Sequence, residues 1–167
     1  MSTDRWVEPL DLSDEATARQ VLRVQHTAYR VEAELIGFDG IPPLHETLDE
    51  LVRRPLDWIG IRADGRIVAA LACQVADEVC DIDRLVVDPE HFGRGYGSAL
   101  VASLLDQPCI TVSTGTANLP ARRLYEKHGF QRVGEVEIAP GVTVTRYVRC
   151  QHPPVVGCDP SRRVRII

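Results

Sequence analysis

The 167-residue chain has no apolar run long enough to span a membrane, no C-x-x-C pair and only one lysine, Lys127. A membrane helix needs about eighteen or more largely apolar residues, and the acidic stretch 1–10 lacks the apolar core of a signal peptide. The formal net charge of −5 disfavours a general nucleic-acid binder, because phosphate recognition needs a basic face. These absences predict a cytoplasmic protein with neither a membrane nor a nucleic-acid partner.

The cysteines give no sign of a disulfide framework or a metal centre. They are odd in number and mostly lie in apolar runs, so reduced structural thiols are expected. The five are Cys73, Cys80, Cys109, Cys150 and Cys158. Together with His152, the two C-terminal cysteines match no standard zinc spacing and lack a fourth ligand, so no metal site is predicted.

Length and composition predict one globular domain. A hydrophobic content of 44% and a charged content of 26% are ordinary for a soluble protein, and a chain of this length buries most of the surface that it exposes when unfolded. The domain is expected over residues 1–150. Residues 151–167 contain three prolines and a glycine and are interpreted as an extended C-terminal tail.

Hydrophobic spacing and capping residues predict a mixed order of helices and strands. The expected elements are helices that open at Ser13 and Thr47, strands over 58–62, 67–75 and 79–87, a helix over 98–105, a strand over 109–113, a helix capped by Asn118, and strands near 130–138 and 142–148. The first three strands have connections too short for a parallel crossover, so they must form antiparallel hairpins. The fold class is therefore α+β (mixed α/β).

Three glycines, Gly93, Gly95 and Gly97, lie between a predicted strand and a predicted helix. Glycines in such a turn let successive backbone amides converge on an anion at the positive end of the helix. The spacing fails the dinucleotide fingerprint, because Ser98 stands where the third glycine belongs, and no lysine follows as a Walker motif requires. A phosphate-binding or pyrophosphate-binding turn is the remaining functional interpretation, and a purely steric turn is the alternative.

Two motifs resemble those of the GCN5-related N-acetyltransferase (GNAT) family. The family's phosphate-binding pattern, Gln/Arg-x-x-Gly-x-Gly/Ala, appears at residues 92–97, although Phe92 replaces the polar first residue and its contribution is lost. The second motif runs from Asn118 to Phe130 and contains Leu-Tyr-Glu-Lys followed by Gly-Phe. The resemblance covers roughly residues 13–149, and its specific residues lie between Asp81 and Phe130.

The resemblance implies a GNAT-like central mixed, mostly antiparallel sheet of about six to seven strands flanked by four helices and splayed between the fourth and fifth strands. Acetyl-CoA is the implied cosubstrate, with its pantetheine arm between the splayed strands. The implied coenzyme-binding residues are Leu85, Val86, Val87, Gly93, Arg94, Gly95, Tyr96, Gly97, Ser98 and Asn118.

The implied reaction moves an acetyl group to a primary amine by direct attack in a ternary complex. Tyr125 is the candidate general acid for the departing thiolate, with a packing tyrosine as the alternative. Asp81 is the candidate general base, because it has the spacing from the glycine turn at which histone acetyltransferases of the family place a catalytic Glu. A solvated strand edge is the alternative for Asp81.

The acceptor is expected to bind along the first two helices, where carboxylates would attract a cationic amine. The candidate substrate-binding residues are Gln25, Tyr29, Glu32 and Glu46, and a polar helix surface is the alternative. The acceptor would be a small-molecule or peptide amine. Its identity and the oligomeric state, a homodimer included, stay open. A non-catalytic acyl-CoA-binding sensor or regulatory module is the competing function, since it needs the glycine turn but neither Tyr125 nor Asp81.

Overall fold

The computed structural model of the protein describes residues 6–152. Helix α1 (Glu15–Ile36) begins where the Asp14 carboxylate accepts a hydrogen bond from the backbone amide of Thr17, and it ends at Gly37, which is left-handed with φ 65°. Helix α2 (Leu48–Arg53) begins with the expected capping box between Thr47 and Glu50. Capping chemistry thus fixes the ends of the two N-terminal helices.

The remaining elements follow the predicted order, with one short strand added at the N-terminal end. They are β1 (Val7–Pro9), the 3-10 helix η2 (Pro42–His45), β2 (Asp57–Ala63), β3 (Arg66–Ala76), β4 (Val79–Val87), the 3-10 helix η3 (Pro89–His91), α3 (Tyr96–Ala102), β5 (Cys109–Gly115), α4 (Leu119–Lys127), β6 (Gln131–Ala139) and β7 (Val142–Cys150). None of the helices within residues 6–152 is long and apolar enough to cross a membrane.

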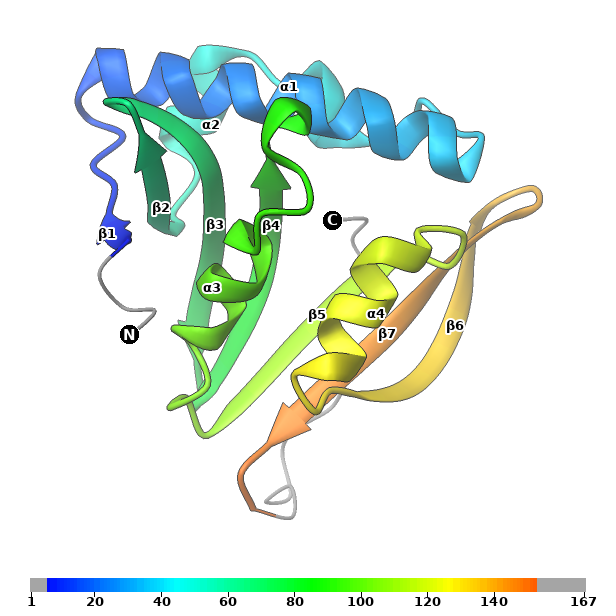
Figure 1. Ribbon diagram of the computed structural model, residues 1–167. Coiled ribbons are helices and arrows are strands. Elements are labelled where there is room, and N and C mark those ends of the chain that lie inside the picture. The colour runs from blue at the N-terminus through cyan, green and yellow to red at the C-terminus, as the bar shows by residue number, and fades with distance from the viewer. Residues whose placement is uncertain (1–5, 153–167) are drawn as a thin grey trace.

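The seven strands form one sheet in the order β1-β2-β3-β4-β5-β7-β6 (Figure 1). Only β4 and β5 run parallel, and all other neighbours are antiparallel. The predicted fold class is confirmed. One hydrophobic core lies between the sheet and helices α3 and α4, and a second lies beneath α1 and α2 on the opposite face.

The parallel pair β4–β5 comes apart part-way along its length. Only residues 79–81 of β4 pair with residues 109–111 of β5, although β4 continues to Val87 and β5 to Gly115. Figure 1 shows the two strands diverging toward α1. The expected splay between the fourth and fifth strands therefore lies between β4 and β5. Beyond Asp81, it leaves the edge of β4 that faces β5 without a strand partner.

A β-bulge lies at the start of the divergence. On β3, Ala72 pairs with Arg84 and Cys73 pairs with Ile82, so Asp83 has no opposite residue. A bulge increases local twist and changes which side chains face each side of the sheet. Ile82 accordingly packs in the core beneath α3, whereas Val86 packs in the core beneath α1. The simple alternation that would put Asp81 and Asp83 on one face is interrupted here.

The expectation of reduced thiols is wrong for one pair, because Cys109 and Cys150 form a disulfide. Antiparallel pairing places them directly opposite each other on β5 and β7, with their Cα atoms 4.1 Å apart. Because the two cysteines are 41 residues apart in the sequence, their proximity follows only from the pairing of β5 with β7. Cys73 and Cys80 are free and buried, as expected. Cys158 and the part of the predicted tail from residue 153 onward lie outside the described residues.

Candidate active site

The glycine turn owes its shape to backbone conformation. Gly93 and Gly95 have φ values of 74° and 81°, and a Cβ at either position would meet no atom within 4 Å. Left-handed backbone, rather than crowding, therefore favours glycine there. Gly97 differs, because a Cβ would lie 3.1 Å from Leu124 Cδ1, so its missing side chain lets α3 approach α4. The turn presents its amides where α3 begins.

The side chains around this turn have separate environments. Arg94 is exposed, and the Tyr96 ring packs edge-on against Trp6 with centroids 6.4 Å apart. The Ser98 hydroxyl lies 2.7 Å from His128 Nε2, an interaction between α3 and α4 that sequence reasoning missed. Burial, with the nearby charges of Lys127 and Arg149, lowers the pKa of His128. This contact joins α3 to the C-terminal end of α4.

The residues Leu85, Val86 and Val87 lie on the part of β4 that has left β5. Leu85 and Val87 pack beside the core beneath α3, and Val86 is buried beneath α1. Their strand is paired with β3 on one side only. The edge that faces β5 therefore offers backbone groups to a ligand in the way that a sheet edge accepts an added strand.

Asn118 and Tyr125 lie on α4, as predicted. The Asn118 side chain accepts a hydrogen bond of 3.3 Å from the Ala121 amide and so caps the helix. Tyr125 is 1% exposed, and its ring packs against Phe130 and Tyr147 at centroid distances of 5.5 and 6.0 Å. Burial, then the nearby charge of Glu32, raises the pKa of Tyr125. The phenol consequently keeps its proton at neutral pH.

Asp81 occupies the last paired position of β4 before the strands diverge. Its Oδ1 accepts a hydrogen bond of 2.7 Å from the Thr111 hydroxyl of β5. The carboxylate thus lies where the opening between β4 and β5 begins, and it helps to join these strands.

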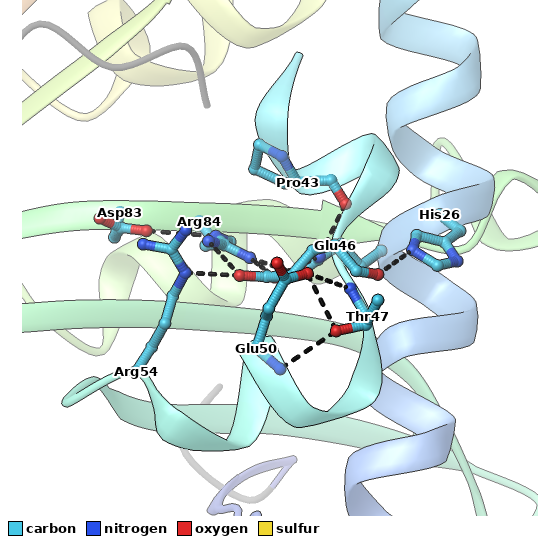
Figure 2. Close-up of polar contacts among 9 residues, drawn as sticks. His26, Pro43, Glu46, Thr47, Glu50, Arg54, Asp83 and Arg84 are labelled. Carbon is cyan, nitrogen blue, oxygen red and sulfur yellow. Dashed lines mark hydrogen bonds and ion pairs between the residues drawn. The ribbon is translucent and has the colours of Figure 1, made fainter.

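A buried polar network, which sequence reasoning missed, lies between β4 and the N-terminal helices (Figure 2). Arg84, 1% exposed, donates two hydrogen bonds to the Glu46 carboxylate and one of 3.1 Å to Asp83. Arg54 also donates to Glu46. Hydrogen bonds from Arg84 and the other donors outweigh burial and hold the pKa of Glu46 below its usual range. The network ties α2 to the diverging strand.

Gln25 completes this network and leaves none of its polar atoms free for a ligand. Its Nε2 donates to the Pro43 carbonyl at 2.9 Å and to Glu46 at 2.8 Å, and its Oε1 accepts from Arg84 at 2.8 Å. Of the four residues predicted to bind the acceptor, Gln25 and Glu46 are therefore engaged with the protein itself.

Tyr29 and Glu32 have buried polar atoms with no protein partner. The Tyr29 hydroxyl and Glu32 Oε1 make no hydrogen bond, although Glu32 is only 8% exposed. Burial raises the pKa of Glu32 to about 7, while hydrogen bonds from Asn118 and the Gly115 backbone oppose the shift. Native structures seldom leave buried polar atoms unpaired unless a ligand or a function requires it.

Comparison with known proteins identifies the family of the chain. Residues 20–130 match the acetyltransferase (GNAT) family. The chain belongs to this family. It is 33% identical over 165 residues to the UPF0157 protein YqkA of Bacillus subtilis, a match that covers 96% of this chain. This chain spans 46% of that relative's length.

Solved structures of the family share the fold. The ribosomal-protein-S18-alanine N-acetyltransferase of Escherichia coli has a TM-score of 0.69, with 15% identity over 90% of this chain and 96% of that chain. The PaiA N-acetyltransferase of Thermoplasma acidophilum, in complex with coenzyme A, has a TM-score of 0.67, with 12% identity over 84% of this chain and 96% of that chain. At these identities the likeness establishes a common architecture.

The raised pKa of Glu32 predicts that this residue destabilises the protein at alkaline pH. Between about pH 4.5 and 7 the folded state holds the Glu32 proton more tightly than the unfolded chain, so stability falls as pH rises through that window. Glu32→Gln should therefore be more stable than the wild type by up to about 3 kcal/mol near pH 8 and similar near pH 4. The urea concentration at the midpoint of unfolding, compared for the two proteins at several pH values between these limits, measures this difference in stability. Glu34→Gln, on the exposed side of α1, keeps Glu32 and should follow the wild-type curve. Equal curves for wild type and Glu32→Gln would show that burial does not raise the pKa of Glu32.

Proposed function

We propose that this protein is an N-acetyltransferase that moves the acetyl group of acetyl-CoA to a primary amine. The observation that carries the proposal is the glycine turn at the start of α3, which lies next to the unpaired edge of β4 in a chain of the GNAT family. A turn that presents amides to an anion and a strand edge that accepts an extended chain match the two halves of coenzyme A.

The coenzyme binds with its pyrophosphate on the amides from Gly93 to Ser98, and the exposed Arg94 adds positive charge. Phe92, half exposed, contributes no polar group there. The pantetheine arm extends along Leu85, Val86 and Val87 and hydrogen-bonds to the free edge of β4. A β4 amide polarises the thioester carbonyl as its oxygen gains negative charge.

Acetyl transfer then requires one new bond, one broken bond and two proton movements. The neutral amine nitrogen attacks the thioester carbon, a C–N bond forms, and the tetrahedral intermediate collapses with cleavage of the C–S bond. The amine gives its surplus proton to a carboxylate. Tyr125 gives its phenolic proton to the departing sulfur and regains one from solvent. The pKa of Tyr125, raised by burial and the Glu32 charge, keeps that proton available.

Two carboxylates compete for the amine proton. Asp81 is the residue that the sequence motif indicates, and its Oδ1 accepts a hydrogen bond from the Thr111 hydroxyl across the two strands. Glu32 has an oxygen without a partner and a pKa of about 7, because burial disfavours its charged form. A general base works best when its pKa lies near the working pH. We therefore propose Glu32 as the proton acceptor, with Asp81 supporting the strand opening.

A thiol-release assay with acetyl-CoA and a broad panel of amines tests the function itself. Free thiol should appear only when an acceptor amine is present, together with an amine product heavier by one acetyl group in mass spectrometry. Coenzyme binding without thiol release for any amine would instead support a sensor or regulatory module and would contradict the proposal.

Removing only the Tyr125 hydroxyl tests its role as the acid. Tyr125→Phe keeps the ring contacts with Phe130, so coenzyme affinity should change little while turnover falls by roughly 10- to 1,000-fold. Tyr147→Phe is the matched control, because that hydroxyl bonds to Glu126 and Arg122 and takes no part in the reaction. Unchanged turnover in Tyr125→Phe would make Tyr125 a packing residue.

Isosteric amides distinguish the two carboxylates. Glu32→Gln should lower turnover most near neutral pH, with partial recovery at high pH as the free amine becomes abundant. Asp81→Asn should stay within about threefold of the wild type across the same pH–rate profile. The reverse pattern, with neutral turnover lost in Asp81→Asn and kept in Glu32→Gln, would assign proton acceptance to Asp81.

A further inference from the structure

Arg146, on β7, is a second residue after Glu32 whose charged group has a buried atom without a hydrogen-bond partner. Nη2 of Arg146 is buried and has no hydrogen-bond partner. Within residues 6–152 the structure shows no ion pair from Arg146 to any carboxylate. Arg84, by contrast, is satisfied by Glu46, Asp83 and Gln25. A buried donor without a partner is unfavourable, so Arg146 has the character of a ligand-binding group.

The register of β7 fixes the face on which Arg146 lies. The pairing of β5 with β7 runs without interruption from Cys109–Cys150 to Gly115–Val144 and places Arg146 opposite Ser113. Val144 is buried in the core beneath α1, whereas Tyr147 is buried in the core beneath α4. Because side chains alternate along a regular strand, Arg146 shares the face of Val144, which is the face covered by α1.

Helix α1 places Glu32 over this same face, beside the end of β5. Its carboxylate is next to the backbone of Gly115, which is the partner of Val144. A Cβ on Gly115 would lie 2.7 Å from Ile36 Cγ2, so α1 packs directly on this end of β5. Arg146 is two residues from Val144, or about 7 Å along the strand. The two charged groups are thus near each other, but they form no ion pair with each other.

A small zwitterion satisfies both groups at once. On the basis of the proposed function, we propose that the acceptor is a free amino acid, whose amino group binds Glu32 and whose carboxylate binds Arg146. A guanidinium donates two parallel hydrogen bonds to a carboxylate, and the amino group is then held at the residue that takes its proton. A polyamine or an aminoglycoside has no anion for Arg146 and would be repelled by it.

Matched acceptors test the assignment. The wild-type protein is assayed by thiol release with free amino acids, with their α-carboxamides and with the corresponding decarboxylated amines. The kcat/KM for the best amino acid should exceed the value for its carboxamide at least about tenfold, because only the acid satisfies Arg146. A wild-type preference for carboxamides or polyamines would overturn the assignment.

Variants then separate the two ends of the acceptor. Arg146→Gln should raise KM for the amino acid by roughly 10- to 100-fold and leave the carboxamide nearly unchanged, with partial recovery in Arg146→Lys. Arg149→Gln is the matched control, since Arg149 lies on the other face of β7 and donates to the Leu105 carbonyl. Glu32→Gln should impair both acceptors, because both carry the amine.

An equal loss for both acceptors in Arg146→Gln, in a variant that melts like the wild type and binds coenzyme A normally by calorimetry, would contradict carboxylate recognition. Failure of the function is distinguishable, since it would appear as no thiol release with any amine. Acetylation of amines without any preference for the carboxylate would reject only the amino-acid acceptor.

Discussion

The buried contact between Arg84 and Glu46 is the interaction on which the shape of the site depends. It joins β4, the strand that diverges from β5, to the segment between α1 and α2, in an environment where neither charge reaches water. Removing one partner of such a pair leaves the other charge buried and uncompensated, which typically destabilises a protein by about 3–5 kcal/mol. Because Arg84 directly follows the bulge residue Asp83, the contact holds β4 at the point where it turns away from β5.

The same contact explains why the polar residues of α1 have different roles. Gln25 hydrogen-bonds to Arg84 within the network. Tyr29 and Glu32 lie one and two turns further along the helix, and the Tyr29 hydroxyl and Glu32 Oε1 have no hydrogen-bond partner. A single helix thereby contributes fully hydrogen-bonded side chains at one point and side chains with unpaired polar atoms at the next. The distinction rests on hydrogen-bond satisfaction and not on residue type, since Glu46 and Glu32 are both buried glutamates with pKa values shifted in opposite directions.

Local patterns predicted much of this fold. The capping box at Thr47, the Asn118 cap and the turns between β2, β3 and β4 depend on neighbouring residues, so the sequence indicated them. The strand β1 is only three residues long and was missed. Non-local features were also missed: the Arg84 network joins segments 38 residues apart, and the disulfide depends on strand register. In α1, the apolar Leu35 is exposed and the charged Glu32 is buried, an arrangement that depends on packing against the sheet.

The proposed function requires that the opening between β4 and β5, together with the glycine turn, holds coenzyme A. Amide hydrogen exchange followed by mass spectrometry, with and without saturating coenzyme A, measures this directly, because ligand hydrogen bonds slow exchange at the amides that make them. We expect slowed exchange in two separate segments, residues 85–87 of β4 and residues 93–98 of the turn. Exchange that is unchanged in both segments, while calorimetry shows that the coenzyme is bound, would contradict this proposal.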